Sequence, residues 1–226
     1  MLGSAFAAAA LAVGLATVPL TAAHADSCVS TVTVADVTIT KSSPGMFDQI
    51  GAHWAQPCGN TSALWNADSE SNGQTKGSWL FTDTAPDQTW PLPYGDNSYL
   101  GQYKAILDPS SGDYYFHVPF FYIRLGSRIL VQGYRSGNYV HLRGYVSRFN
   151  WNLNNGYGAY QPSRGRAVNF YEHTGNGWKV VGVLPTGADG FTDYISVYSP
   201  SAHQWGDKVL ASDTLAQARP RHNISR

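Results

Sequence analysis

The chain has 226 residues, of which 13% are charged and 13% aromatic, and its formal net charge is zero. Only two glutamates occur, Glu70 and Glu172, whereas Gly, Tyr, Ser, Asn and Thr are abundant. This composition favours strands and turns, and no heptad or amphipathic helical stretch follows residue 25, which excludes a coiled coil.

Residues 1–25 have the pattern of an export signal. An apolar run from Ala5 to Leu20 ends in small residues before Asp26, which is the expected cleavage point. The alternative is a membrane anchor, but about 16 apolar or small residues fall short of the roughly 20 that span a bilayer. Met1 to Ser4 carry no Lys or Arg, which leaves open a start upstream. We expect a secreted protein with no membrane span after residue 25.

The chain contains two cysteines, Cys28 and Cys58. In an exported protein an even pair predicts a disulfide bond. The bond would close a loop of about 30 residues and contribute on the order of 3 kcal/mol by the chain-entropy model. A nucleophilic thiol or a metal ligand is the alternative, but neither has a partner motif here.

Alternating apolar and polar residues, separated by Gly, Asp and Asn turn formers, predict short antiparallel strands throughout the rest of the chain. In the first half they cover 31–40, 49–55, 77–81, 101–107 and 114–125. In the second half they cover 128–133, 139–146, 167–172, 178–184, 191–196 and 208–212. About six strands per half predict two antiparallel β-sandwiches.

The two halves differ in charge. Residues 26–125 hold ten acidic and four basic residues, a net charge of −6, whereas residues 126–226 hold five acidic and eleven basic residues, a net charge of +6. This asymmetry predicts an acidic domain over 26–125, a basic domain over 126–215 and a flexible tail over 216–226. The basic domain would face an anionic partner, or the two domains would attract each other or a second copy.

The second half, from about Phe121 to Leu215, resembles immunoglobulin-like domains, often in tandem, of small secreted proteins from Gram-positive filamentous bacteria. The segments that carry the resemblance are Phe121-Tyr122-Ile123-Arg124, Val140 to Val146, Gly165 to Tyr171, Gly177-Trp178-Lys179-Val180-Val181, Thr186 to Phe191, and Trp205-Gly206. The first half matches more weakly, chiefly at Gly101 to Ala105. The resemblance implies two tandem immunoglobulin-like sandwiches. It brings no catalytic residue, and a fold alone does not fix a function.

Catalytic motifs are missing from the sequence. The histidines after residue 25 show no i, i+3 or i, i+4 pair, and no H-E-x-x-H, G-x-S-x-G or S-x-x-K motif occurs. We therefore expect a protein that is not an enzyme and needs no cofactor.

Two groups of acidic residues are candidates for chemistry. Asp68 to Gly73 places oxygen side chains at alternate positions before a glycine, as a Ca²⁺ loop would, but Trp79 stands where an EF-hand needs its bidentate Glu. A solvated polar loop is the favoured interpretation. Asp83 and Asp87 lie just before Trp90 and could form the paired carboxylates of a carbohydrate-acting hydrolase, although aspartates in Pro-containing loops are commonly turn formers.

Aromatic residues in loop-like sequence form the candidate binding surface, together with two arginines. Its members are Trp90, Tyr94, Tyr99, Trp151, Tyr157, Tyr160, Arg164 and Arg166. Exposed rings with Asn and Arg neighbours suit a sugar or protein surface, unless the rings anchor the loops to their own sandwich. We expect the partner to be an anionic envelope polymer or another extracellular macromolecule, and not a nucleic acid. A structural spacer without a ligand is the third hypothesis.

Overall fold

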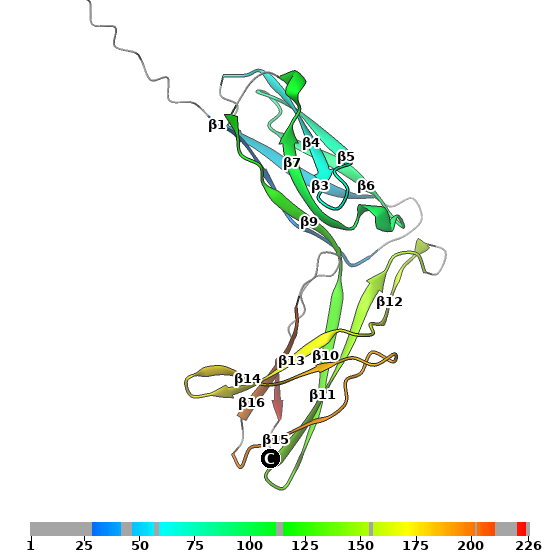
Figure 1. Ribbon diagram of the computed structural model, residues 1–226, viewed down its shortest axis with the longest axis vertical. Helices are drawn as coiled ribbons and strands as arrows, with labels where there is room; N and C mark the ends of the chain where they lie inside the picture. Colours follow the sequence, from blue (N-terminus) through cyan, green and yellow to red (C-terminus); the bar gives the residue numbers. More distant parts are fainter. Residues whose placement is uncertain are drawn as a thin grey trace, which may run out of the picture.

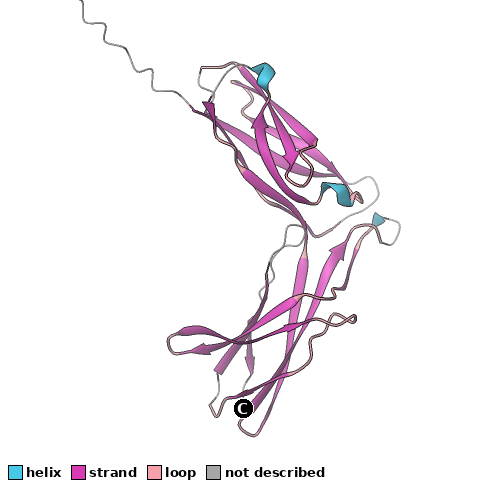
Figure 2. Ribbon diagram, viewed as in Figure 1, coloured by secondary structure: helices cyan, strands magenta, loops and turns pink. Residues whose placement is uncertain are grey.

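The computed structural model describes residues 29–41, 47–56, 59–111, 115–153, 156–201, 203–210 and 221–224. These residues form strands almost throughout, with short 3-10 helices such as η1 (Asn97–Tyr99) and η2 (Pro109–Ser111) (Figure 2). The all-β prediction is confirmed. The expected export signal at 1–25, Cys28 and Cys58 lie outside the described residues, so the signal and the disulfide stay predictions.

The first sandwich consists of two sheets built from residues 29–125 (Figure 1). One sheet has the order β6-β3-β1-β8 and the other the order β2-β9-β7-β4-β5. Their strands are β1 (Val29–Val34), β2 (Val37–Ile39), β3 (Phe47–Gln56), β4 (Ser62–Ser69), β5 (Thr75–Thr82), β6 (Asp87–Pro93), β7 (Gly101–Leu107), β8 (Tyr115–Phe116) and β9 (Phe120–Leu125). Neighbours are antiparallel except in two short pairs, β1–β8 and β2–β9, which are parallel.

The second sandwich follows the first after one residue, Gly126 (Figure 1). One sheet has the order β10-β11-β12, with β15 also paired to β11, and the other has the order β14-β13-β16-β17. Its strands are β10 (Ser127–Ser136), β11 (Tyr139–Asn150), β12 (Ala159–Pro162), β13 (Ala167–Thr174), β14 (Gly177–Pro185), β15 (Ile195–Tyr198), β16 (His203–Val209) and β17 (Arg221–Ile224).

Both sandwiches have the strand order of an immunoglobulin-like domain. In that fold, strands A, B and E share one sheet, and strands C, F and G share the other, which can carry an extra strand C′. β1, β3 and β6 take the places of A, B and E, and β4, β5, β7 and β9 those of C, C′, F and G. In the second sandwich the same places are taken by β10, β11 and β15, and by β13, β14, β16 and β17.

Two side chains of the first sandwich reproduce features typical of this fold. Trp65, on the strand in place C, is completely buried. Tyr103, on the strand in place F, donates its hydroxyl to the carbonyl of Tyr99 at 3.0 Å, as the tyrosine corner does. Burial raises the pKa of Tyr103 to about 12, so this donor keeps its proton. Ala105, two residues further on, stands where antibody domains have a cysteine.

Each sandwich has its own hydrophobic core. The first core is rich in tryptophan and contains Trp54, Trp65, Trp79 and Trp90. The second is smaller and is built around Phe170 and Trp205. Phe149 and Trp151, which lie in and just after β11, belong to the first core. The second sandwich therefore contributes side chains to the core of the first.

Several predicted element boundaries were wrong. β4, β6 and β12 were not predicted as strands, and the strand expected over 114–125 is divided into β8 and β9 around Pro119. Arg221–Ile224 were expected in a flexible tail, but they pair with β16 as β17. The strand expected over 191–196 lies at Ile195–Tyr198 instead.

Candidate functional site: an arginine pocket between the sandwiches

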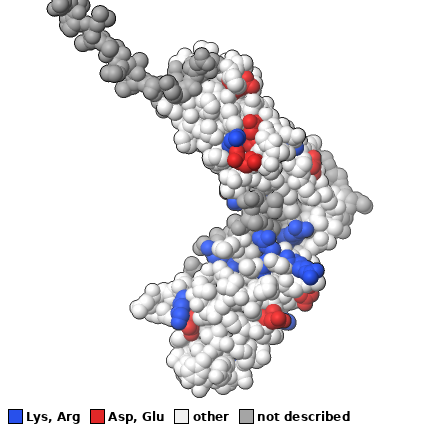
Figure 3. Space-filling view, in the orientation of Figure 1, with Lys and Arg blue, Asp and Glu red and all other residues white. Residues whose placement is uncertain are grey.

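A pocket of about 460 Å³ lies where the two sandwiches meet. Asn97, Leu100 and Leu125 contribute from the first sandwich. The second sandwich contributes Arg148 and Asn150 of β11, Pro162 of β12, and Ser163, Arg164 and Arg166 of the turn before β13. We call these nine residues the arginine pocket. Figure 3 shows that Lys and Arg side chains gather on the second sandwich beside this junction.

The charge in the pocket is positive. Among the described residues no ion pair involves Arg148 or Arg164, and both side chains are exposed. Burial, and in second place the charge of Arg148, lower the pKa of the Arg166 guanidinium below its ordinary value. Arginine nevertheless stays protonated, so like charges lie close together here. An anion between them would relieve this repulsion, and guanidinium groups match carboxylate and phosphate geometry.

The turn that carries Arg164 and Arg166 is fixed by one buried hydroxyl. Thr186 accepts a hydrogen bond from the backbone N–H of Arg166 at 2.9 Å and donates its own proton to the carbonyl of Ser163. Gly165 has a φ of 71°, a left-handed conformation that glycine adopts without strain. The two arginines are therefore presented on a defined turn.

The opposite wall is held to the second sandwich by Trp151. Its indole Nε1 donates to Oδ1 of Asn97 at 2.8 Å, and its ring meets that of Tyr94 edge-on at 5.8 Å. The backbone N–H of Phe149 donates to the carbonyl of Gly126 at 2.7 Å. These contacts fix the two sides of the pocket relative to each other.

The structure brings together only part of the predicted binding surface. Arg164 and Arg166 line the pocket, and Trp151 supports it. Tyr160 is half-buried beside the junction, where its ring packs against Phe149 and under the guanidinium of Arg128. Tyr157, in contrast, is exposed and is not among the pocket residues.

For the two tryptophans the structure supports the second interpretation, in which the rings pack against the protein itself. Trp90 lies on β6 and is 7% exposed. Its indole ring is buried directly against the backbone of Gly77, which has no side chain to block it. Trp151 is 1% exposed. Tyr94 and Tyr99 are half-buried against the first core, and Tyr94 donates to Asp48 at 3.1 Å. Burial, with help from Asp48, raises the pKa of Tyr94 above its ordinary value.

Sequence reasoning missed Arg148, Asn150 and Asn97. The first two lie on the last four residues of β11, beyond the predicted end of that strand at residue 146. The alternation of inward and outward residues continues to the end of β11, but it is interrupted where the consecutive residues Val146 and Ser147 are both buried. Asn97 lies in η1 and had no sequence signal.

The other predicted acidic groups are engaged in local contacts. Asp68 accepts from the hydroxyl of Thr75 at 2.6 Å, and Glu70 pairs with Lys104 at 3.1 Å, so this segment forms the β4–β5 turn. Asp87 lies on β6 and pairs with His53 at 2.8 Å on the surface. Because Trp90 is in the core, its ring is not available to bind a sugar beside Asp83 and Asp87.

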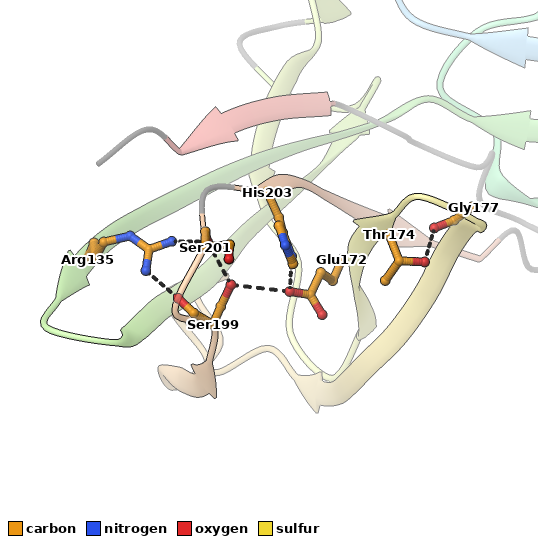
Figure 4. Close-up of polar contacts among 7 residues, drawn as sticks. All are labelled: Arg135, Glu172, Thr174, Gly177, Ser199, Ser201 and His203. Atoms are coloured by element: carbon orange, nitrogen blue, oxygen red, sulfur yellow. Dashed lines mark hydrogen bonds and ion pairs between the residues drawn. The ribbon is translucent and has the colours of Figure 1, made fainter.

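A partly buried polar cluster in the second sandwich contains Ser, His and Glu side chains (Figure 4). Glu172 accepts from Ser199 at 3.3 Å and lies 2.5 Å from Nδ1 of His203. In a catalytic triad the histidine stands between the serine and the acid, whereas here the carboxylate stands between the other two. Arg135 donates to the carbonyls of Ser199 and Ser201. The cluster therefore ties the β15–β16 connection to β10 and β13.

The part of the chain that the structure describes contains neither a candidate metal centre nor a membrane-spanning helix. No group of three or more His, Cys, Asp or Glu side chains in that part of the chain is arranged to hold a metal ion. No helix in the same residues is long and apolar enough to cross a membrane.

No protein family model matches the sequence, and no curated protein matches it either. Solved structures similar to it include the BSP domain of a biofilm associated protein (13% identity, TM-score 0.31), covering 86% of this chain and 29% of that one. A second is trypsin-activated alpha-2-macroglobulin from Escherichia coli (12% identity, TM-score 0.33). The match covers 88% of this chain and 15% of that one. A third is the human OSCAR ligand-binding domain (10% identity, TM-score 0.33). The match covers 86% of this chain and 97% of that one. The similarities are weak, and the strand order above carries the fold assignment.

Proposed function

We propose that this chain is a secreted, non-enzymatic protein of two immunoglobulin-like sandwiches that binds an anionic polymer of the cell envelope in the arginine pocket. The observation that carries the proposal is the convergence of Arg148, Arg164 and Arg166 on one pocket between the sandwiches. Another anionic extracellular macromolecule would satisfy the same chemistry.

The pocket suits a charged group better than an apolar one. Asn97, Asn150 and Ser163 add polar groups beside the three guanidinium groups, and Leu100, Leu125 and Pro162 supply the apolar part of the lining. A polymer with repeated carboxylates or phosphates would present one group to the pocket and others to neighbouring basic side chains. Such contacts steer association and weaken as salt rises.

The test is cosedimentation of the purified full chain with cell-wall sacculi at low salt and at about 1 M salt, where charges are screened beyond about 3 Å. We expect retention at low salt that is lost at high salt. The double variant Arg148→Gln/Arg164→Gln should weaken retention at least about fivefold, which is about 1 kcal/mol.

The matched control is Lys179→Gln/Lys208→Gln, which removes the same charge from the second sandwich outside the pocket. It should bind nearly as well as the unchanged protein. Equal losses in both double variants would mean that net charge alone drives binding, and would refute the pocket. Absence of retention at low salt would refute the envelope polymer as partner.

A further inference from the structure

The outer face of the sheet formed by β10, β11 and β15 is covered with aromatic side chains. On β11 the outward residues are Tyr139, His141, Arg143 and Tyr145, because Val140, Leu142, Gly144 and Val146 face the core. Strand register places Tyr134 beside His141 and Tyr198 beside Tyr139. Phe191 and Tyr194 extend the face beyond β15. We call this surface the aromatic face, and it comprises Leu130, Gln132, Tyr134, Tyr139, His141, Arg143, Tyr145, Phe191, Tyr194, Ser196 and Tyr198.

The exposed tyrosines among the described residues are concentrated on this face. Five described tyrosines are exposed, and four of them belong to it: Tyr134 (51%), Tyr139 (49%), Tyr194 (46%) and Tyr198 (61%). A single exposed ring needs no explanation, but a contiguous group on one sheet face marks an interaction surface.

The rings are held in three consecutive groups along β11. Tyr139 meets Tyr198 edge-on at 5.5 Å. Tyr134 stacks on His141 at 4.7 Å and meets Tyr194 edge-on at 5.6 Å, whereas Tyr145 packs against Phe191 at 4.7 Å. Tyr139 to Tyr145 span about 20 Å at the rise of a β-strand. Because neighbouring rings restrain each other, little side-chain entropy remains to be lost when a ligand binds.

Charge is scarce at the outward strand positions of the face, although the exposed Asp193 lies next to Tyr194 before β15. Arg143 is the one charged side chain at the outward positions of β10 from 130 to 136, β11 from 139 to 145 and β15. Its guanidinium lies over the rings of Phe191 and Tyr194, 4.4 and 5.1 Å from their centroids. Its Nε donates to Gln132 at 2.9 Å, and His141 hydrogen-bonds Ser196 at 2.8 Å. Hydrogen-bonding groups are thus interleaved with the rings.

We infer that the aromatic face binds an extended chain of neutral pyranose sugars. Rings suit this ligand because aromatic ring faces are negative and stack against the positive C–H face of a sugar. Sugar hydroxyls can pair with Arg143, Gln132, His141 and Ser196. A lipid surface would need more cationic side chains around the rings, and a basic protein would find no carboxylate at these outward positions. This site does not depend on the arginine pocket.

The experiment measures retention of the full chain on three insoluble β-1,4-linked polysaccharides, cellulose, chitin and xylan, at about 1 M salt. At this ionic strength electrostatic binding through the arginine pocket is suppressed, whereas ring stacking persists. We expect retention on at least one polysaccharide. Tyr139→Ala/Tyr198→Ala should weaken it at least about tenfold, and Arg148→Gln/Arg164→Gln should leave it unchanged.

The control variant is Tyr157→Ala/Trp178→Ala, which removes two exposed rings outside the face. Near-ultraviolet circular dichroism and the unfolding midpoint show whether each variant is folded, and Tyr134→Ala serves as a second test of the face. No retention on any of the three polysaccharides overturns the inference. Equal loss in the face and control variants also overturns it, as does self-association that depends on Tyr139 and Tyr198 in the absence of polysaccharide binding.

Discussion

Trp151 and Asn97 are 54 positions apart and join the two sandwiches through one hydrogen bond of 2.8 Å between Nε1 and Oδ1. The tryptophan is 1% exposed and packs in the core of the first sandwich, although it follows a strand of the second. Asn97 also lines the arginine pocket. The same contact therefore contributes to stability at the junction and to the shape of the pocket.

Replacing Trp151 by Phe should remove this hydrogen bond and part of the buried ring. We expect the free energy of unfolding to fall by about 1–3 kcal/mol, because the hydrogen bond to Asn97 is lost and a small cavity forms beside the buried ring. Urea unfolding measures the change. Trp178→Phe makes the same substitution at a ring that is 39% exposed and should change stability by less than about 0.5 kcal/mol. Equal effects would mean that the junction contact is not stabilising.

Gly126 is the single residue between β9 and β10, and it is buried. A Cβ there would lie 2.7 Å from Cγ2 of Thr40, 3.0 Å from the hydroxyl of Tyr160 and 3.1 Å from the carbonyl oxygen of Ile39. Gly126→Ala should therefore destabilise the protein by about 1–3 kcal/mol through overpacking. Gly51→Ala is the control, because a Cβ there meets nothing within 4 Å. Differential scanning calorimetry should show a lower midpoint for the first variant alone.

The fold class could be predicted from the sequence because most strands alternate cleanly, as β7 and β11 do. β6 was missed because it contains Pro91 and Pro93, which suggested a loop. It is the edge strand of its sheet, where proline needs no N–H partner, and Trp90 and Leu92 still point into the core. β4 was missed because small alanines at its inward positions weaken the apolar signal.

The arginine pocket was only half predictable. Arg164 and Arg166 are two residues apart and share a turn, so local sequence indicated them. Arg148 and Asn97 reach the pocket through tertiary contacts, by the extension of β11 and by the packing of Trp151 on the first sandwich. Contacts between residues far apart in the chain produce no periodic pattern in the sequence, so they could not be predicted from it.

The predicted disulfide between Cys28 and Cys58 can be tested from its flanking strands. β1 and β3 are antiparallel, and Thr31 pairs with Gln56, so the described strand ends next to the two cysteines lie side by side. We expect non-reducing peptide mapping to recover one cross-linked peptide. Cys28→Ser/Cys58→Ser should lower the free energy of unfolding by about 3 kcal/mol. Free thiols in the unreduced protein would contradict the prediction.

The stability of the protein should fall as the pH rises from about 4 to 7, because of Asp207. This carboxylate is 3% exposed on the core side of β16, and among the described residues no other residue hydrogen-bonds either of its oxygens. Burial raises its pKa to about 7, and only its own backbone N–H opposes this effect. In the unfolded chain an aspartate has a pKa of about 3.9.

Between these two values the folded protein keeps a proton that the unfolded chain has released, so each rise in pH favours unfolding. The free energy of unfolding stops falling above about pH 7. The total decrease is on the order of 2–4 kcal/mol, since one pKa unit corresponds to about 1.4 kcal/mol. Asp207→Asn should remove this slope and be more stable than the unchanged protein at pH 8. Asp193→Asn, at an exposed position of the same sandwich, should keep the slope. Urea unfolding between pH 4 and 8 measures both, and a slope that persists in Asp207→Asn would assign it to another group.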